Sequence, residues 1–334
     1  MPESVPFNDD VSILSTSYMP AAFRDEHYTL YKPTADILHF LQKDLSVERL
    51  NRIHKYLWLA GRPMPPRPLN YQTATSRDIV PDERIDMHLV WEHSRRIHLK
   101  PIPRYLLNYQ FWVYHLICAK TCPCLSRPEY RGTMRGDGIC QKKKLYEYSL
   151  GFLLSYIALI QCESDFVIAQ DHHLLPENVT WEDWHKLVQQ LLDNGAANPR
   201  NINARYLFGE LRLSRLNKIC AFRYGSILRG YQFTFQTYGE LFRDYLAPLA
   251  ATTIYVALVL TAMQVGLATT RLGDNLAFQR ASYGFTVFSI LGPLIAVLLV
   301  GLIGLFQFIS NLVVTLRFKR ERSAHYKLLS SQGW

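Results

Sequence analysis

The sequence predicts a mainly α-helical protein, in which a helical N-terminal domain precedes a C-terminal transmembrane helical hairpin. Two long uncharged runs predict the hairpin, and apolar residues spaced three or four apart predict helices upstream of it. Charge separates the same two parts, because residues 247–334 hold only seven of the 37 Lys and Arg and two of the 28 Asp and Glu. The remaining 30 basic and 26 acidic residues are nearly balanced, as in a folded soluble domain, so no nucleic-acid partner is expected.

Residues 247–269 and 284–306 are the two predicted transmembrane helices. Each is uncharged over its 23 residues, and a helix of that length covers about 34 Å, enough to cross a hydrocarbon core of about 30 Å. Residues 270–283 are predicted to form a short loop between them. The alternative, two helices buried in a large soluble core, is disfavoured because such runs rarely occur back to back in water-soluble chains.

The orientation follows from basic residues near the ends of the spans. The tail, residues 317–334, is basic, whereas the loop carries only Arg271 and Arg280, partly offset by Asp274. We therefore expect both termini in the cytosol and the loop on the outer side, in a membrane whose organelle the sequence does not specify. Anionic lipid is the expected contact of the basic residues in the tail, which are Arg317, Lys319, Arg320, Arg322 and Lys327.

Small residues within the spans are spaced for close approach of the two helices. Gln264 is the most polar residue of the first span, and a hydrogen bond from its amide to the partner helix is expected, with a pore-lining role as the alternative. The predicted packing positions are Ala262, Gln264, Gly266, Gly292 and Ala296.

Ahead of the membrane, residues 1–24 are predicted to be a disordered leader without a secretory signal, and residues 25–240 a mostly helical cytosolic domain. Residues 46–61 are expected to form one helix capped by Ser46. Residues 62–69, RPMPPRPL, are expected to be an extended rigid connector, with an SH3-type ligand as the alternative.

Further helices are predicted along the domain. Residues 82–91 are expected to be helical, and the proline-interrupted stretch 97–107 to be extended. Residues 149–162 are uncharged but too short for a straight span, so a core helix is predicted, with a membrane-dipping segment as the alternative. Thr180 and Asp183 predict a capping box. Residues 204–223 read as an amphipathic helix with a basic face formed by Arg205, Arg212, Arg215, Lys218 and Arg223.

Two clusters contain residue types that carry chemistry. Four thiols, which could in principle hold zinc, depart from standard zinc spacing: Cys118, Cys122, Cys124 and Cys140. Asp171, His172 and His173 could bind metal or move protons, although an adjacent His pair is more often structural. No hydrolase, kinase, dinucleotide or metalloprotease motif occurs, so no cofactor is expected and the sequence gives an enzyme little support.

As a whole the chain resembles the fungal two-span membrane proteins that carry a domain of unknown function. The matching segments include RLNRIHKYLWLAGRPMPPRPL, LFGELRLSRLNKI and FQRASYGFTVFSILGP, and together they cover most of residues 45–295. The resemblance implies a fungal membrane protein and supplies no activity, cofactor or catalytic residue. Residues 125–144 look like a variable insertion beside it, which lowers the support for a zinc site.

Three functions remain as hypotheses. The leading one is a membrane-anchored protein, not an enzyme, whose cytosolic domain binds a protein partner or lipid. The second is a homo-oligomeric channel or transporter subunit, since the layout resembles the CorA-type magnesium channels; their Gly-Met-Asn motif is absent, and GLATTRLGDN stands in its place. The third is a membrane-bound enzyme that uses the region of Asp171, His172 and His173.

Overall fold

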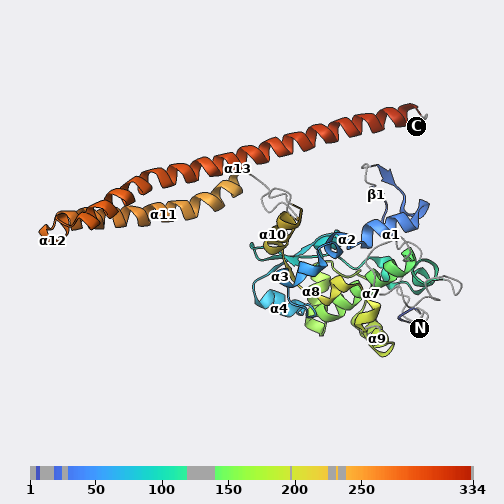
Figure 1. Cartoon of the computed structure of the whole chain (residues 1–334). Coiled ribbons are helices and arrows are strands. Elements are labelled where there is room, and N and C mark those ends of the chain that lie inside the picture. Colours follow the sequence, from blue (N-terminus) through green and yellow to red (C-terminus); the bar gives the residue numbers. More distant parts are fainter. Residues whose placement is uncertain are drawn as a thin grey trace. The chain divides into compact units, whose positions relative to one another are not determined.

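In the computed structural model, the described residues are 5–7, 19–24, 29–118, 140–195, 198–224, 231 and 238–331. The chain divides into two compact units, Met1–Gln232 and Phe233–Trp334. The protein is mostly helical, at 67%, with two apolar helices near the C-terminus, which confirms the mainly α class. Figure 1 shows the elements of both units coloured along the chain.

The first unit is built from helices of two sizes. The longer ones are α1 (Ile37–Leu45), α7 (Gln141–Leu159), α8 (Glu163–Asp171), α9 (Trp181–Asp193) and α10 (Leu213–Tyr224). The short ones are α2 (Glu48–Asn51), α3 (Leu57–Ala60), α4 (Leu69–Ala74) and α5 (Tyr109–Phe111). Single turns connect them: η2 (Pro33–Ala35), η3 (His54–Tyr56), η4 (Ile85–Met87), η5 (Arg104–Leu107), the π-helical η6 (Trp112–Leu116), η8 (Pro199–Asn201) and η9 (Ala204–Leu207).

A small sheet, which the sequence analysis did not predict, joins distant parts of the first unit. Its strands are β3 (Asp78–Pro81), β4 (Val90–Trp91), β5 (Arg96–Leu99) and β6 (Leu211–Arg212), in the order β3-β5-β4-β6. The β4–β6 pair is parallel and places Trp91 opposite Arg212. A separate antiparallel pair joins β1 (Phe23–Arg24) to β2 (Leu30–Tyr31). The sheet therefore brings residues near 90 beside residues near 211.

Helix α7 forms the centre of the core. Leu150, Phe152, Leu153 and Tyr156 are all fully buried, which confirms the prediction of a core helix over residues 149–162. By length and composition α7 and α8 together could also pass as a span, but they are bent by 114° at their junction. Burial of these side chains within the first unit agrees with a core helix.

Three local predictions in this unit are corrected. Residues 46–61 form α2, η3 and α3 instead of one helix, although Leu50, Ile53 and Leu57 share a buried face as expected. Residues 82–91 are mostly not helical, because His88 leaves η4 in an extended conformation and the chain enters β4. In the stretch 97–107, β5 is extended but Arg104–Leu107 is a 3-10 turn. The capping box at Thr180 and Asp183 is confirmed, with both hydrogen bonds present.

The predicted basic helix over 204–223 begins later than expected and loses two members of its basic face, Arg205 and Arg212. Helix α10 starts at Leu213, after the turn η9 and the strand β6. Arg205 is buried and donates to the carbonyl oxygens of His88, Phe208 and Gly209. Its guanidinium therefore ties η9 to the β4 region instead of facing solvent.

The first residues are not all a detached leader. Phe7 is buried against Trp112, with ring centroids 5.8 Å apart, and the Asn194 side-chain amide donates to the carbonyl oxygen of Pro6 at 2.9 Å. Most of the predicted leader lies outside the described residues, as does most of the predicted insertion 125–144. Residues 141–144 of that insertion form the first turn of α7.

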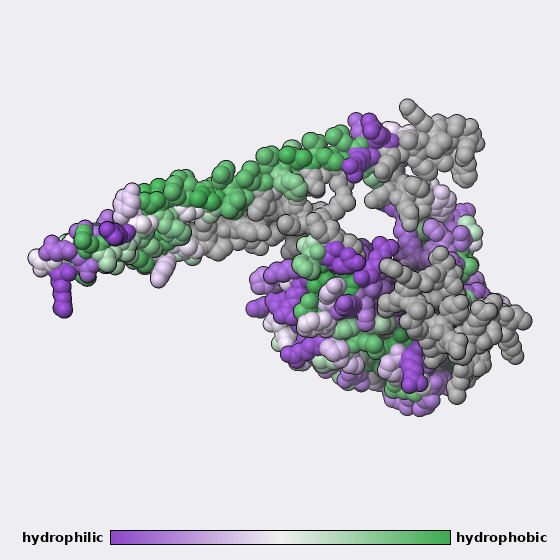
Figure 2. Space-filling model, viewed as in Figure 1, coloured by the Kyte–Doolittle hydropathy of each residue, from purple (hydrophilic) through white to green (hydrophobic). Residues whose placement is uncertain are grey.

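The second unit is a helical hairpin. It consists of α11 (Tyr238–Leu267), the single turn α12 (Thr270–Gly273) and α13 (Leu276–Ser331). Two segments are long and apolar enough to cross a membrane, Ala250–Leu267 and Leu276–Phe306. The turn is shorter than predicted, because α13 begins at Leu276 and makes residues 276–283 helical. Figure 2 shows the continuous apolar surface of α13, and almost none of its span is buried.

A close contact between the two helices of the hairpin lies next to the turn. A Cβ atom added to Gly266 would lie 2.9 Å from Cζ of Phe278, so glycine permits α11 to meet α13 there. Gly292 faces only Phe288, one turn earlier in its own helix. Gln264 is exposed, and no hydrogen bond joins its amide to α13 among the described residues, contrary to the expected helix-to-helix bond. Ala262 is exposed as well.

Candidate functional site

The thiols considered for zinc are only partly described. The sulfur atoms of Cys118 and Cys140 lie 3.3 Å apart, and Cys122 and Cys124 lie outside the described residues. Within the described part of the chain, no group of three or more His, Cys, Asp or Glu side chains could hold a metal ion. The described thiols alone therefore supply two ligand atoms where a zinc site takes four.

Asp171, His172 and His173 close the C-terminus of α8. The backbone N–H of His172 donates to Ile168 and that of His173 to Gln170, while His173 adopts the left-handed region at φ 54°. Asp171 and His173 are exposed. The backbone of this segment ends a helix, which is the structural reading of an adjacent His pair.

A buried Ser–His pair, which the sequence analysis did not single out, lies in the core. His88 Nε2 lies 2.9 Å from Ser155 Oγ, as in a catalytic dyad. However, Nδ1 of His88 accepts from the backbone N–H of Lys100 at 3.1 Å, so the ring proton is on Nε2. Ser155 in turn donates to the Phe152 carbonyl oxygen at 2.6 Å. Burial lowers the pKa of His88, helped by the charges of Arg205 and Lys100. A general base would need the opposite hydrogen-bond direction, so this pair is structural.

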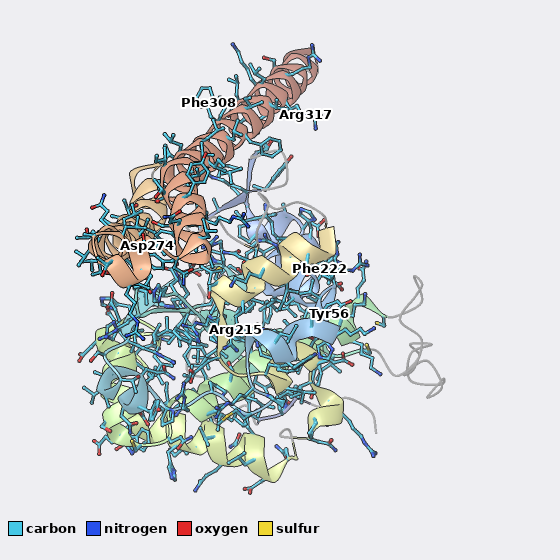
Figure 3. All side chains as sticks on the ribbon, turned by 60° about the vertical axis from the view of Figure 1, so that its left-hand side comes forward. Tyr56, Arg215, Phe222, Asp274, Phe308 and Arg317 are labelled. Atoms are coloured by element: carbon cyan, nitrogen blue, oxygen red, sulfur yellow. The ribbon has the colours of Figure 1, made fainter. Side chains whose placement is uncertain are left out.

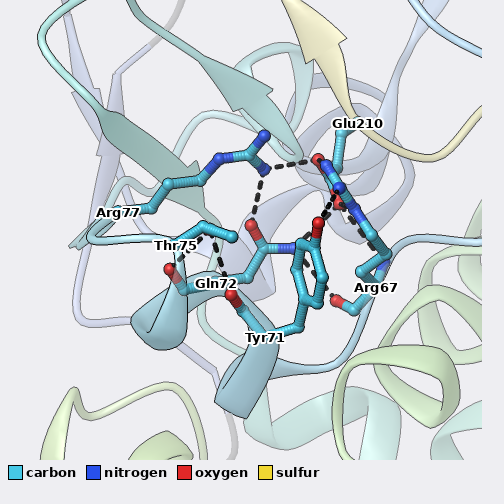
Figure 4. Close-up of polar contacts among 6 residues, drawn as sticks. All are labelled: Arg67, Tyr71, Gln72, Thr75, Arg77 and Glu210. Carbon is cyan, nitrogen blue, oxygen red and sulfur yellow. Dashed lines mark hydrogen bonds and ion pairs between the residues drawn. The ribbon is translucent and has the colours of Figure 1, made fainter.

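An ion cluster around Glu210 is the most elaborate polar arrangement near the surface. Figure 4 shows Arg67, Gln72 and Arg77 converging on the Glu210 carboxylate. Arg67 Nε donates to Oε1 at 2.9 Å and Gln72 Nε2 to the same oxygen at 2.8 Å, while Arg77 binds Oε2. Burial alone would raise the pKa of Glu210, but hydrogen bonds from Arg67, Arg77 and Gln72 lower the pKa to about 2. The carboxylate is therefore ionised and fully engaged.

Close backbone packing brings the connector to this cluster. A Cβ atom on Gly209 would lie 2.7 Å from the carbonyl oxygen of Met64 and from the nitrogen of Pro66. The segment 62–69 is thus an internal connector that runs against Gly209 and Glu210, and it carries Arg62 and Arg67 to the cluster. The reading of this segment as a rigid connector agrees with these contacts.

The side chains of Trp91 and Arg212 complete the cluster. The guanidinium carbons of Arg77 and Arg212 lie 4.6 Å and 4.7 Å from the centroid of the Trp91 ring. A pocket of about 340 Å³ lies here, which we call the arginine pocket. Its lining residues are Ala60, Arg62, Met64, Pro65, Arg67, Arg77, Trp91, Glu210, Arg212 and Arg215. The sequence analysis missed it because these residues come from four separate segments; the only local signal is Glu210, the single acid in residues 204–223.

Next to the pocket, α3 and α10 expose large apolar side chains among basic ones. Phe222 is 89% exposed and Trp58 63% exposed. Arg215, Lys218 and Phe222 follow the i, i+3, i+7 spacing of one helix face, and Arg215 Nη1 donates to the Leu59 carbonyl oxygen at 3.1 Å, which ties α10 to α3. Figure 3 shows Arg215 and Phe222 near opposite ends of α10. We call Trp58, Leu59, Arg215, Lys218, Phe222 and Arg223 the α3–α10 face.

The fold and these surfaces define a class of protein: a mostly helical domain joined to two helices that are long and apolar enough to cross a membrane. The chain belongs to a family of unknown function, DUF6601, whose model matches residues 37–293. The match begins with α1 and ends inside α13, so domain and hairpin turn both belong to what the family shares. No curated protein and no solved structure matches the chain.

Proposed function

We propose that the protein is a membrane-anchored binding protein whose N-terminal domain lies in the cytosol and contacts anionic lipid through the α3–α10 face. The hairpin is the anchor, crossing the bilayer twice with both termini cytosolic. The resemblance to fungal two-span membrane proteins supports this assignment, as does the concentration of basic residues after the second span. The proposal carries no enzymatic step.

The observation that carries the proposal is the combination of exposed aromatic and basic side chains on the α3–α10 face. Phe222 and Trp58 expose most of their surface, although single exposed aromatic residues of this size are costly in water. Arg215, Lys218 and Arg223 are exposed around them. Aromatic rings at headgroup level with bases beside them are typical of surfaces that contact anionic bilayers, at about 1 kcal/mol per well-placed base.

Chain order gives this face ready access to a bilayer. Helix α10 ends at Tyr224 and α11, which contains the first span, begins at Tyr238. The tail beyond the second span adds Arg317, Lys319, Arg320, Arg322 and Lys327, of which Arg317, Lys319 and Arg320 are exposed. Two basic segments of one chain, one before and one after the hairpin, would then contact the same leaflet.

Photo-crosslinking tests the contact directly. The full chain carrying p-benzoylphenylalanine at position 222 is reconstituted in vesicles of phosphatidylcholine, with or without phosphatidylserine, and irradiated. We expect lipid adducts by mass spectrometry, with a higher yield when phosphatidylserine is present and a lower yield at high salt. The same label at Tyr114, which is also exposed but lies on η6 outside the face, is the control. If the label at position 222 formed adducts with protein only, the partner of the α3–α10 face would be a protein instead of lipid.

Topology has a separate test at the sequence Asn178-Val179-Thr180. Asn178 and Thr180 are exposed, so an oligosaccharyltransferase could reach this sequon if the domain were in the lumen. We expect no glycan on the wild-type chain. The same chain directed into the lumen by an added signal peptide should be glycosylated, which makes the negative result informative. A glycan on the wild-type chain would reverse the orientation.

A homo-oligomeric channel is the second candidate function, favoured by one observation. Gln264 is exposed on α11 without a partner among the described residues, and an unpaired amide in lipid is costly. A neighbouring copy could satisfy it. Since two helices cannot enclose a pore, the protein mass of the complex in mild detergent decides: a ring of four or more copies would favour the channel, and a monomer or dimer the anchored binding protein.

A further inference from the structure

We propose that the arginine pocket binds a phosphate-bearing anion, with Arg62, Arg77 and Arg212 as the main ligands. This site is distinct from the α3–α10 face and does not require the proposed lipid contact, although Arg215 borders both. The ligand chemistry is a phosphomonoester, carried by a soluble metabolite or by a lipid headgroup.

Charge is the first reason. Five guanidinium groups and one carboxylate line the pocket. The one carboxylate, Glu210, already accepts hydrogen bonds from Arg67, Arg77 and Gln72. The lining therefore holds a large excess of positive charge in a partly buried space, where like charges repel and a second anion is stabilised.

Unused hydrogen-bonding capacity is the second reason. Nε of Arg212 is buried and has no hydrogen-bond partner in the described part of the chain. A buried donor without a partner is costly, so an acceptor that reached Arg212 would relieve this cost. Arg77 binds Glu210 and Gln72 through the same nitrogen, Nη1, which leaves its Nε and Nη2 without a hydrogen-bond partner among the described residues.

Preorganisation is the third reason. Trp91 holds the Arg77 and Arg212 guanidinium groups at 4.6 Å and 4.7 Å from its ring centroid, and the β4–β6 pairing fixes Arg212 opposite Trp91. Because the two forks are stacked before any ligand arrives, little side-chain entropy remains to be lost on binding. Arg62 is exposed at the rim and can close on a bound anion.

The shape of the ligand follows from these donors. Planar guanidinium forks bind pairs of oxygen atoms, and a phosphomonoester offers three oxygens and up to two negative charges, whereas a second carboxylate would offer two oxygens and one charge. The volume of about 340 Å³ lies within the range of small-molecule sites and exceeds what one phosphate fills. The phosphate is thus expected to carry an organic group of small size.

The test uses the full chain in nanodiscs of phosphatidylcholine and titrates inorganic phosphate, and then pyrophosphate, by calorimetry. We expect saturable binding, and a rise in Tm of the domain with phosphate concentration. The variant Arg62→Gln/Arg212→Gln leaves the ion pairs of Glu210 intact and should weaken binding by about tenfold or more. The control Arg104→Gln/Arg200→Gln removes the same charge from exposed sites outside the pocket and should bind like the wild type.

Nanodiscs containing phosphatidic acid, compared with phosphatidylserine at equal surface charge, distinguish the two sources of the phosphate. Loss of inorganic phosphate binding in nanodiscs that contain phosphatidic acid, but not in those that contain phosphatidylserine, identifies a lipid headgroup. Phosphate binding without any effect of phosphatidic acid identifies a soluble ligand. Both outcomes support the pocket, whichever way the crosslinking at position 222 turns out.

A third variant, Glu210→Gln, should increase the stabilisation by phosphate instead of reducing it. Glu210→Gln removes the competing carboxylate, so it should lower Tm without phosphate and show a larger rise in Tm with phosphate than the wild type. The proposal is overturned if no phosphate binding is detected, or if Arg62→Gln/Arg212→Gln and Arg104→Gln/Arg200→Gln lose affinity equally. Equal losses of affinity would show that phosphate binding depends on the net positive charge of the protein and not on the arginine pocket.

Discussion

The two units of this chain bury and expose polar and apolar groups in opposite ways. In the first unit, Leu150 and Phe152 are fully buried, and the charged Arg205 and Lys100 are buried with hydrogen-bond partners. In the second, Leu294 and Leu298 are more than 60% exposed, and the charged residues stand ahead of the first apolar segment, near the turn and in the tail. One pattern suits water and the other suits lipid, because each leaves on the outside the groups that its solvent accepts.

The largest expected effect concerns a buried charge of the first unit. Arg205→Met should lower the free energy of unfolding by at least about 3 kcal/mol, because three carbonyl oxygens lose their donor in a buried site. Burial lowers the pKa of Arg205 to about 10, so the group remains charged at neutral pH. Urea denaturation of the reconstituted chain, followed by tryptophan fluorescence, measures the change. Arg200→Met, at an exposed position on η8, should have almost no effect.

If Arg205→Met and Arg200→Met were equally stable, the first unit would not depend on satisfied buried charge. The comparison would then lose the contribution of buried charge in the first unit, since the domain would tolerate an apolar side chain in place of a fully buried cation.

The next effect concerns the second unit. Leu298→Arg places a cation well inside the longer apolar segment, near the centre of the predicted span 284–306, and should oppose membrane insertion by about 2.5–3.5 kcal/mol. Insertion is measured as resistance of the newly made protein to alkaline extraction from microsomes. Phe318→Arg, among the bases of the tail, should remain inserted. Equal extraction of wild type, L298R and F318R would mean that α13 is not held by lipid.

Two histidines of the first unit, His98 and His88, should contribute to stability with opposite pH dependence. His98 lies between Asp82 and Glu92, with Nε2 3.0 Å from Glu92 Oε1 and Nδ1 3.3 Å from Asp82 Oδ2, and these carboxylates raise its pKa. Its stabilising contribution is therefore full below the unfolded pKa of about 6.5 and lost as the pH rises through the raised value. Burial lowers the pKa of His88, so its contribution is full above about 6.5 and lost as the pH falls.

The Tm of the wild type should thus decline on both sides of neutral pH. His98→Gln should flatten the alkaline side only, and His93→Gln, at an exposed position, should leave the profile unchanged. The measurement is Tm by differential scanning fluorimetry over about pH 5 to pH 9. An alkaline decline that persists in H98Q would assign it to another group.

Sequence reasoning succeeded where one local property decides the structure. Uncharged length identified two apolar helices, and the spacing of Trp184, Leu187 and Leu191 identified the buried face of α9. It failed where pairing across long separations decides. Val90 and Trp91 complete a helical pattern by themselves, and become strand β4 because they pair with His98 and Ile97 of β5 and with Leu211 and Arg212 of β6.

The same limit explains the missed site. Arg67, Arg77, Trp91 and Arg212 are separated by up to 145 positions, and each reads alone as a solvated or stacking side chain. Arg205 shows the converse error, since its helical spacing placed it on a basic face while its guanidinium is buried under β4. Neither local spacing nor charge counts reveal which arginines a later strand will enclose.

The smallest expected effect tests the contact between Gly266 and Phe278 in the hairpin. Gly266→Leu should destabilise the α11–α13 pair by about 1 kcal/mol, because a Cβ atom at this position would lie 2.9 Å from the Phe278 ring, whose end can shift. Gly301→Leu is the matched control, since nothing lies within 4 Å of a Cβ atom there. Thermal unfolding in mild detergent should rank G266L below G301L, with G301L equal to the wild type. Equal values for both variants would mean that the turn and the lipid, not helix packing, hold the hairpin together. The two units would then differ in what holds their helices together as well as in what they bury.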